Sequence, residues 1–330
     1  MSSRHDHAVG IDLGATTIKA ALVKREEGLS EELALSTEAD QGPEHIIDRI
    51  ARIVRQLTGD APAERIAGVG IGSPGAINWE RTTVTQPPNM PGWETVNLRD
   101  ALQERLDFDD PVLVENDASA AGLGSAHYGA GRPFPSFIMV TLGTGVGGAI
   151  IYQDRIFRGS TGGAAELGHM TIDYEGPVAR SGVAGAIEAY LGHRFLSRHA
   201  RDRLRTRATR LHDMTEQDLD DLTPKMLHEA AEQGDEPARE MLAWAGHKLG
   251  CALGSTVNLL DIRKVVVGGG ISQAGDYLLD PAREALPRYV MPGLQDDLDI
   301  VQETLGNEVG MLGAAHLVFA HQQDHDLSTA

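Results

Sequence analysis

The sequence predicts an α/β protein built from two related domains. The main observation is an internal repeat, because "VGIDLGATTIKAALV" (9–23) and "IMVTLGTGVGGAIIY" (138–152) both place a Leu-Gly turn between two apolar runs. Such repeats, far apart in one chain, indicate related domains, although unrelated hairpins with glycine turns can also look alike. Strand and helix patterns follow both units, and 330 residues suffice for about two domains.

In the first half, the pattern alternates between strands and helices. After the first hairpin, "EELALSTEA" (31–39) reads as a strand, and apolar residues at helical spacing predict a helix over 46–57. The apolar run "IAGVGIGSPG" (66–75) predicts a buried strand that ends in a glycine turn. "PVLVEND" (111–117) predicts another strand, and the small residues of "ASAAGLGSA" (118–126) predict a closely packed helix.

In the second half the same order returns. The return strand of the second hairpin turns at "QDR" (153–155), and residues 188–233 read mostly as helices with a charged, solvated middle. A longer helix over 236–260 precedes the buried strand and glycine turn of "KVVVGGG" (264–270). A small-residue helix within 306–323 closes the chain. Because no low-complexity linker is present, we expect the two domains to be tightly joined.

Composition and charge exclude several classes of protein. Hydrophobic residues make up 41% and charged residues 23%, as in soluble globular proteins. The net charge of −19 disfavours nucleic-acid binding, which normally needs a basic surface. We find no secretory signal pattern and no apolar run near the ~20 residues that span a bilayer, so we expect a cytoplasmic protein. The single cysteine, Cys251, excludes an intrachain disulfide. The acidity could reflect a halophilic host or could simply keep the protein soluble.

Two glycine turns fit the dinucleotide pattern G-x-G-x-x-G, at 70–75 (GIGSPG) and 143–148 (GTGVGG). The pattern requires a helix after the turn, whereas extended sequences follow both, so a Rossmann dehydrogenase is disfavoured. Between paired strands, a glycine turn has another use. Without a Cβ, its backbone can approach a phosphate and direct several N–H groups at the oxygens.

Polar side chains around these turns suit a phosphate ligand. Thr16, Thr17 and Thr144 could add hydroxyl donors. Asp12 would repel a phosphate directly, but it fits if Mg²⁺ or its water shell lies between the two groups. Lys19 could supply a cation, although a solvated strand lysine is an equal alternative.

The motifs of the chain resemble those of a known family. Asp12-Leu13-Gly14-Ala15-Thr16-Thr17, "TLGTGVGG" and "VVVGGGIS" (265–272) look like the two phosphate motifs and the adenosine motif of actin-like ATPases and sugar kinases. More narrowly, the chain resembles the ROK family of bacterial sugar kinases and sugar-responsive repressors in four segments, which follow the order of the family: "NMPGW" (89–93), "ENDASAAGLG" (115–124), "ELGHMTID" (166–173) and "GAAHL" (313–317).

The resemblance implies two ribonuclease-H-like α/β domains around a central cleft. Residues 1–116 with 311–330 would form the N-terminal domain and residues 117–310 the C-terminal domain. Nucleotide binding is implied for three groups of residues, in the first turn, the second turn and the adenosine motif: Asp12, Gly14, Thr16, Thr17 and Lys19; Thr141, Gly143, Thr144 and Gly145; Gly268, Gly269 and Gly270. Asp12 would bind Mg²⁺, through water.

The resemblance also implies a base and a sugar pocket. Asp117 corresponds to the aspartate that would accept the proton of the sugar hydroxyl, and a positioned base contributes about 10²–10⁴-fold. Asn116 or Asp117 could instead simply cap the following helix, or could do both. Carboxylates, imidazole and amides together match the adjacent hydroxyls of a sugar. The implied sugar-binding residues are Gly75, Asn89, Asn116, Asp117, Glu166, His169 and Glu188.

One departure from the family concerns zinc. Members commonly carry three cysteines in C-x-C-G-x-x-G-C-x-x-E, which hold zinc together with the histidine of E-x-G-H. When the final glutamate is aligned with Glu188, these positions hold Ala179, Ser181 and Ala186. Alanine cannot bind a metal and serine is a poor zinc ligand. We therefore predict no zinc site, and we expect a backbone or carboxylate hydrogen bond to orient His169 instead.

The sequence thus predicts an ATP- and Mg²⁺-dependent sugar kinase that acts by direct in-line transfer, with the 6-hydroxyl of glucose as the leading acceptor. Fructose, mannose, allose and N-acetylmannosamine remain alternatives, as does an inactive sugar-binding relative. A repressor would need a DNA-binding domain, and only eight residues precede Val9. A structural actin-like ATPase would lack the set of groups that bind sugar hydroxyls. The family suggests a homodimer or homotetramer, and the sequence leaves the choice of phosphoryl donor open.

Overall fold

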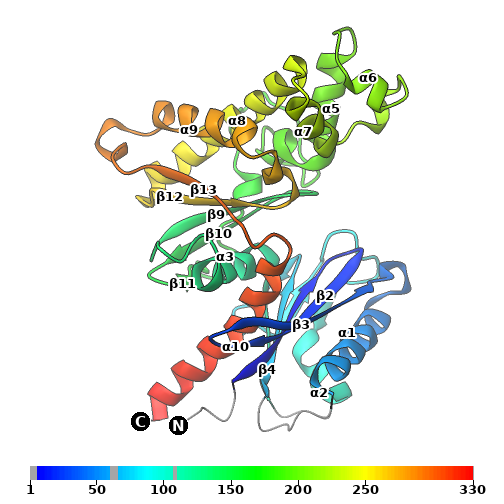
Figure 1. Ribbon diagram of the computed structural model, residues 1–330. Coiled ribbons are helices and arrows are strands. Elements are labelled where there is room, and N and C mark those ends of the chain that lie inside the picture. The colour runs from blue at the N-terminus through cyan, green and yellow to red at the C-terminus, as the bar shows by residue number, and fades with distance from the viewer. Residues whose placement is uncertain (1–5, 60–65, 107–109, 330) are drawn as a thin grey trace. The chain divides into compact units, whose positions relative to one another are not determined.

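The computed structural model describes residues 6–59, 66–106 and 110–329. The chain divides into two compact units (Figure 1). Unit 1 comprises Met1–Pro135, Ala149–Ala165 and Asn307–Ala330, and unit 2 comprises Ser136–Gly148 and Glu166–Gly306.

Unit 1 is organised around a five-stranded sheet with the order β3-β2-β1-β4-β8. These strands span β1 (His7–Leu13), β2 (Thr17–Lys24), β3 (Gly28–Ser36), β4 (Ile66–Ser73) and β8 (Val112–Asn116). The first three strands are antiparallel, whereas β4 pairs in parallel with both β1 and β8. Because parallel strands end at the same edge, the ends of β1, β4 and β8 lie together, and this edge carries the predicted site residues of unit 1.

Opposite faces of this sheet carry different helices. The amphipathic helix α1 (Pro43–Thr58) buries its apolar face on one side against β1, β2 and β4, next to α2 (Leu98–Leu106). On the other side α10 (Glu308–Thr329) packs directly on the sheet. The contact is so close that a Cβ atom at Gly10 or Gly70 would overlap the backbone of α10. Figure 1 shows α10 and α1 on opposite sides of these strands.

Helix α3 (Asp117–Tyr128) packs against α10 within unit 1. The backbones of the two helices are in direct contact. A Cβ atom at Gly124 would overlap the carbonyl oxygen of Val309, and a Cβ atom at Gly313 would overlap the carbonyl oxygen of Ala120. We expected a domain boundary at Asp117. The structure instead places Asp117 and all of α3 in unit 1, since small residues let the two helices approach closely.

Unit 2 repeats the strand order of unit 1. The second sheet has the order β11-β10-β9-β12-β13, from β9 (Phe137–Leu142), β10 (Val146–Tyr152), β11 (Arg155–Ile156), β12 (Lys264–Gly268) and β13 (Asp299–Gln302). β12 pairs in parallel with both β9 and β13, as β4 does with β1 and β8. The predicted internal repeat is therefore confirmed, and a division between the units falls within β10.

Two long helices, α8 (Glu236–Leu260) and α9 (Asp276–Tyr289), pack against each other in unit 2. Gly246, Gly250 and Gly254 recur every four residues along α8, and a Cβ at any of them would meet backbone or Cβ atoms of α9 at less than ordinary contact distance. The predicted helix over 236–260 is confirmed.

The remaining elements are short. The predicted helical region of unit 2 contains α4 (Glu188–Leu191), α5 (His193–Leu204), α6 (Leu211–Met214) and α7 (Pro224–Glu232). Unit 1 has a three-stranded sheet of β5 (Ala76–Ile77), β6 (Thr83–Thr85) and β7 (Thr95–Asn97). The 3₁₀ helices are η1 (Ala39–Gln41), η3 (Leu167–His169), η4 (Leu219–Asp221), η5 (Gly270–Ala274) and η6 (Pro292–Leu294).

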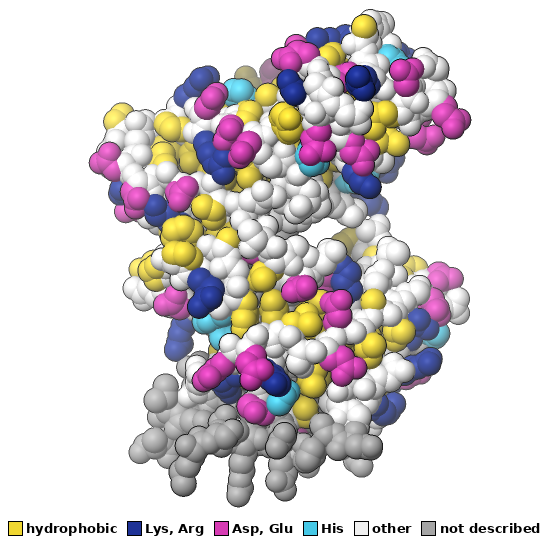
Figure 2. All heavy atoms as spheres, in the orientation of Figure 1, with side chains coloured by type: hydrophobic (Ala, Val, Ile, Leu, Met, Phe, Trp, Pro, Cys, Tyr) yellow, Lys and Arg dark blue, Asp and Glu magenta, His cyan; other side chains and the backbone are white. Residues whose placement is uncertain are grey.

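The surface carries charge of both signs. On the face shown in Figure 2, acidic side chains are spread over both units, with basic side chains among them. Within the part of the chain that the structure describes, no helix combines the length and the apolar character needed to cross a bilayer.

Candidate functional site

The first glycine turn of unit 1 is a tight connection between β1 and β2. The Gly14 N–H donates to the Thr17 carbonyl at 3.0 Å, and the buried Thr37 hydroxyl donates to the Gly14 carbonyl at 2.6 Å. The Thr16 side chain is exposed and Thr17 is half-buried. The turn is therefore held from behind by Thr37, which the sequence did not single out.

Asp12 lies at the end of β1, directly opposite Lys19 of β2 and beside Gly72 of β4. Burial and the nearby charge of Asp117 raise the pKa of Asp12 to about 6, and the charge of Lys19 opposes this shift. Asp12 and Asp117 thus share one electrostatic environment. A second cation near them would lower the cost of keeping both carboxylates ionised.

Asn116 and Asp117 lie where β8 ends and α3 begins. The Asn116 side-chain oxygen accepts hydrogen bonds from the N–H groups of Ala118 (3.0 Å) and Ser119 (3.1 Å), so Asn116 is the N-cap of α3. The Asp117 carboxylate accepts from its neighbour Ala118 at 2.8 Å. The capping role considered for Asn116 is confirmed, and the Asn116 side chain also hydrogen-bonds the Asp117 carboxylate.

The environment of Asp117 changes its acidity. Burial raises the pKa of Asp117 above its ordinary value, and the hydrogen bond from Ala118 N–H opposes that rise. A raised pKa makes a carboxylate a stronger base while leaving it ionised near neutral pH, if the rise is moderate. This is the acid–base character expected of a proton acceptor for an alcohol.

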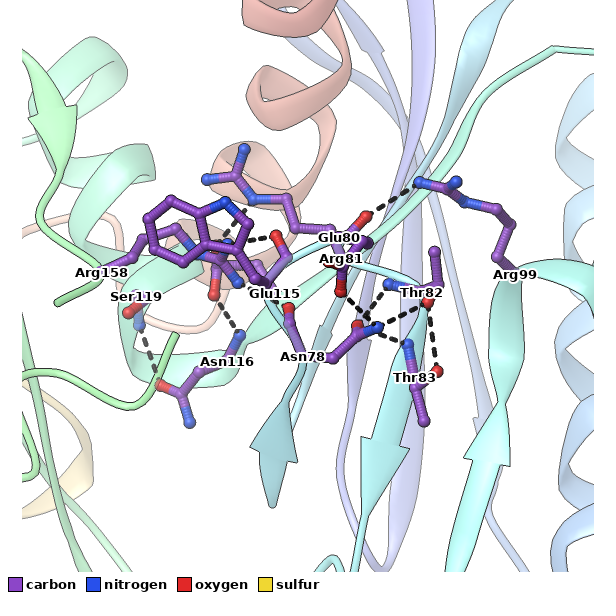
Figure 3. A network of polar contacts seen from close by, with 11 residues as sticks. Asn78, Glu80, Arg81, Thr82, Thr83, Arg99, Glu115, Asn116, Ser119 and Arg158 are labelled. Carbon is purple, nitrogen blue, oxygen red and sulfur yellow. Dashed lines mark hydrogen bonds and ion pairs between the residues drawn. The ribbon is translucent and has the colours of Figure 1, made fainter. Parts of the chain in front are cut away.

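A network of polar contacts lies behind these residues (Figure 3). Glu115 is 1% exposed, and its carboxylate contacts the Nε atoms of Arg81 and Arg158, each at 2.9 Å. Its other oxygen accepts from the Asn116 N–H at 3.0 Å. Sequence reasoning missed Glu115 and Arg158, because their pairing joins residues far apart in the chain.

The predicted sugar residues Gly75 and Asn89 also lie in unit 1. Gly75 has a φ of +94° and a Cβ there would lie 2.8 Å from the Thr85 carbonyl oxygen, so this position requires glycine. Asn89 is exposed and has a φ of +62°. The buried side chains of Met90 and Trp93 anchor the loop that carries Asn89.

The second glycine turn belongs to unit 2 and contacts Glu188. One Glu188 carboxylate oxygen accepts from the Val146 N–H at 3.2 Å, and it lies so close to Gly145 that a Cβ there would overlap it. The Gly143 carbonyl accepts from the His193 N–H at 2.9 Å, whereas a Cβ at Gly143 would meet open space. Thr141 is the second-last residue of β9, just before this turn. Glu188 thus orders the predicted phosphate turn, a role that the sequence did not suggest.

The third glycine turn packs against the end of β9 in unit 2. Gly269 has a φ of +86°, and a Cβ there would overlap the Leu142 backbone just before the second turn. Gly268 is buried at the end of β12, whereas Gly270 has open space where a Cβ would lie. After this turn the structure has the 3₁₀ helix η5 and then α9.

Glu166 directly precedes the short helix η3 of unit 2, and His169 is the last residue of that helix. The nearest Glu166 oxygen lies 3.8 Å from His169 Nε2, too far for a hydrogen bond. On the other side of the ring, the Ser181 hydroxyl lies 3.1 Å from His169 Nδ1. We expected a backbone or carboxylate hydrogen bond to orient His169, whereas the structure places the hydroxyl of Ser181 at Nδ1.

The residues aligned with the zinc cysteines do not fit a zinc ion. Ala179 is 5% exposed and Ala186 is fully buried, and both belong to a small apolar cluster with Ala189 and Phe195, against which Val183 packs. With Ser181 as the third position, the three aligned side chains offer one hydroxyl and two methyl groups. Apolar packing therefore holds the segment 179–186, which zinc-bound cysteines would hold in the family pattern.

A preformed metal cage is not found within residues 6–59, 66–106 and 110–329, where no group of three or more His, Cys, Asp or Glu side chains could hold an ion. Mg²⁺ is often bound by one or two carboxylates together with substrate phosphates and waters. Asp12, with its raised pKa and the nearby charge of Asp117, fits that mode of binding.

Comparisons with known proteins agree with this geometry. The protein-family profile described as "ROK family" matches residues 8–321. The glucokinase of Thermotoga maritima is 33% identical over 310 residues, which cover 94% of this chain and 96% of that protein. The glucokinase of Streptomyces coelicolor is 35% identical over 317 residues, with the same coverage of both chains.

Among solved structures, the ROK family glucokinase of Streptomyces griseus, crystallised with glucose and AMPPNP, superimposes with a TM-score of 0.82 at 32% identity. The match covers 94% of this chain and 98% of that one. It confirms the expected fold of actin-like ATPases, with two α/β repeats. On the strength of a match that runs through nearly the whole chain, the protein belongs to the ROK family.

Proposed function

We propose that this ATP-dependent sugar phosphotransferase is a glucokinase, which transfers the γ-phosphoryl group of ATP directly to the 6-hydroxyl of glucose. The observation that carries the proposal is Asp117, a half-buried carboxylate held at the start of α3. Its position at the end of β8 and its raised pKa support a role as the general base. The relatives named above are glucokinases, which supports glucose as the acceptor.

The reaction proceeds without a covalent enzyme intermediate. Asp117 accepts the proton of the 6-hydroxyl as that oxygen attacks the γ-phosphorus, and ADP leaves from the opposite side. The configuration at phosphorus is therefore inverted. The N-terminus of α3 favours the ionised form of Asp117, so that the base is available near neutral pH.

The remaining hydroxyls of the sugar are bound by groups that donate and accept. The side-chain oxygen of Asn116 caps α3, and its amide nitrogen carries two N–H groups, so it can donate to a sugar hydroxyl as well as to Asp117. Asn89, Glu166, His169 and Glu188 complete the set in this proposal, and backbone at Gly75 approaches the sugar. A His169 tautomer whose Nδ1 accepts a hydrogen bond from the Ser181 hydroxyl would present Nε2–H as a donor.

The phosphates are bound mainly by backbone N–H groups of the two glycine turns, with the hydroxyls of Thr16, Thr17 and Thr144 as additional donors. Mg²⁺, when bound, neutralises charge on the phosphates. Asp12 would hold it through water, and Lys19 lies opposite Asp12 to balance its charge. The backbone of Gly268, Gly269 and Gly270 supports the adenosine.

The proposal is tested by measuring ADP release with a coupled assay in the presence of glucose, mannose, fructose, allose or N-acetylmannosamine. We expect the highest kcat/KM with glucose and no more than slow ATP hydrolysis without sugar. Phosphorus NMR of the product assigns the phosphate to O6. A clear preference for another sugar, or turnover independent of sugar, would refute the glucokinase assignment.

The assembly is proposed to be a homodimer or homotetramer, as the family resemblance suggests. Light scattering after size-exclusion chromatography measures the mass directly. A mass equal to that of one 35.4 kDa chain would show that this part of the proposal is wrong.

A further inference from the structure

A buried ion pair in unit 1, between Glu115 and Arg158, lies outside the residues discussed as substrate contacts. Glu115 is 1% exposed and Arg158 is 9% exposed. Arg158 follows the β10–β11 hairpin and lies in the segment Ala149–Ala165, which belongs to unit 1 although unit 2 flanks it on both sides in sequence. Gly122 of α3 packs against Ala149 and Ile151 of this segment.

Arg158 is fixed on three sides. Its Nη1 donates to the Trp79 carbonyl at 2.6 Å and its Nη2 donates to the Asn78 carbonyl at 3.0 Å. Its Nε lies 2.9 Å from a Glu115 oxygen, at an angle that suits an ion pair rather than a hydrogen bond. The guanidinium carbon also lies 5.1 Å from the centre of the Trp79 ring. Lysine could not reproduce these contacts, because it lacks the planar fork.

The loop that receives Arg158 is itself ordered. The Asn78 side-chain oxygen accepts from the N–H groups of Thr82 (2.8 Å) and Thr83 (2.9 Å). Gly162, with a φ of +99°, donates its N–H to the Arg158 carbonyl at 3.1 Å, and a Cβ there would lie 2.7 Å from the Ile77 carbonyl oxygen. The segment after Arg158 is therefore held against this loop on its way to Glu166.

Glu115 connects Arg158 to the proposed base. One of its oxygens contacts Arg158 and Arg81, and the other accepts from the Asn116 N–H at 3.0 Å. The Arg81 carbonyl in turn accepts from the Val114 N–H at 2.9 Å. These contacts hold the last residues of β8, Glu115 and Asn116, directly before α3 begins (Figure 3).

We propose that Arg158 and Glu115 are positioning residues, which together hold Asn116 and Asp117 in the geometry for phosphoryl transfer and fix the segment that leads to Glu166. This inference rests on the proposed function, because it assigns a task to the same base. A single carboxylate thus orders both the base and the chain that precedes the sugar-binding glutamate.

A purely structural role for the pair makes a different prediction. Removing Arg158 alone leaves the buried Glu115 carboxylate with less countercharge, because Arg81 remains beside it, and this destabilises the protein. Replacing both Glu115 and Arg158 with neutral residues is often tolerated, and the Arg81 side chain that remains is partly exposed. If the pair only stabilises the fold, restoring stability should restore activity. If it positions Asp117, activity should stay low even in a stable variant.

The experiment compares Arg158→Met, Glu115→Gln and the double variant with Arg99→Met as the matched control. Arg99 donates to the carbonyls of Val112 (3.0 Å) and Glu80 (3.1 Å), on the same strand and loop, and it does not contact Glu115. Each protein is assayed for kcat, for KM of glucose and of ATP, and for Tm, at a temperature well below its Tm.

We expect kcat to fall by about 100-fold in Arg158→Met, the loss that a displacement of about 1 Å at a reacting group can cause. The KM for ATP should change by less than about twofold. In the double variant Tm should recover towards that of the wild type while kcat stays low, and Arg99→Met should keep kcat within about twofold.

Each alternative outcome is decisive. If the wild type is active and the stable double variant has wild-type kcat, the pair is only structural and the inference is wrong. If Arg158→Met fails to fold, the double variant and Arg158→Lys take its place. A low kcat in a stable variant then supports the positioning role, and a wild-type kcat contradicts it. If the wild type transfers phosphate to no sugar, the proposed function itself fails, and this inference fails with it.

Discussion

Units 1 and 2 have the same arrangement of strands but different side chains at equivalent places. In both, a hairpin with a glycine turn lies beside two parallel strands. The turn of unit 1 follows Asp12, and the turn of unit 2 follows Thr141 in the equivalent place. The first turn thus has a carboxylate with a raised pKa where the second has a threonine, so the two turns would have different tasks in the proposed phosphate site.

The ends of the outer parallel strands extend this comparison. β8 ends in Asn116, which caps α3, and Asp117 follows. β13 ends just before Glu303, a buried residue whose carboxylate accepts from the N–H groups of Thr304 (2.8 Å) and Leu305 (3.0 Å). Both strand ends thus carry a side chain that binds the following N–H groups. In unit 1 a further carboxylate, that of Asp117, lies at the start of the helix directly after the strand, which fits the catalytic role proposed for it.

The largest effect is expected at Asp117. Asp117→Asn keeps the shape of the side chain but removes the base, so kcat should fall by about 10²–10⁴-fold in the coupled assay. Residual activity above a tenth of the wild type would show that another group accepts the proton.

The same variant also makes a prediction on stability. Because the pKa of Asp117 is raised in the folded state, its ionised form costs stability above that pKa. Asp117→Asn should therefore raise Tm at pH 8, and this advantage should shrink as the pH falls. An equal gain in Tm at pH 8 and pH 4.5 would contradict the proposed burial of the charge.

Asp12→Thr would make the first turn resemble the second. We expect kcat/KM to fall by about 10- to 100-fold, the loss typical of removing a group that supports a metal, with a higher Mg²⁺ concentration needed for half-maximal rate. Thr141→Asp is the reciprocal variant and should instead raise the KM for ATP, through repulsion of the phosphates. If Asp12→Thr leaves the Mg²⁺ dependence unchanged, Asp12 does not hold the ion.

A stacked pair of histidines in unit 1 predicts a loss of stability in acid. Burial and the charges of His127 and Arg25 lower the pKa of His316 to about 3. A histidine held neutral in the fold contributes stability above its unfolded pKa of about 6.5, and loses it as the pH falls towards the folded value. Between these two pKa values, one such group lowers the unfolding free energy by about 1.4 kcal/mol for each pH unit that the pH falls.

Urea unfolding at pH 7.5 and pH 5.5 measures this effect. His316→Gln should reduce the difference in unfolding free energy between the two pH values by about 1 kcal/mol. The exposed His45 provides the control, since His45→Gln removes a histidine that pairs with Glu38 on the surface. Equal pH dependence in the wild type and in His316→Gln would show that His316 is not held neutral.

The smallest effect is expected at Ser181. Ser181→Ala removes the hydrogen-bond partner of His169 Nδ1, which should raise the KM for glucose by about 2- to 10-fold, as a net hydrogen bond of about 0.5–1.5 kcal/mol implies. Ser255→Ala, at an exposed serine of α8, should leave the KM unchanged. Elemental analysis should find no stoichiometric zinc, and one tightly bound equivalent would show that the apolar cluster around Ala179 and Ala186 was misread.

Much of the fold was predictable because its signals are local. The glycine turns at Gly14 and Gly143, the apolar runs beside them and the helix over 236–260 each follow from a short stretch of sequence. The boundary expected at Asp117 was not predictable in this way. It depends on how closely α3 approaches α10, and their contact residues, Gly124 and Gly313, are far apart in the chain.

By itself, the sequence determined the α/β class, the internal repeat and the chemical types of the candidate site, because period, glycine turns and residue type are properties of short segments. The tertiary structure alone decided that Glu115 meets Arg158, that Ser181 meets His169 and that Glu188 binds the second glycine turn. Such contacts join residues whose separation along the chain carries no local signal. They form because burial of charged and polar groups is tolerated only where the folded chain supplies a partner.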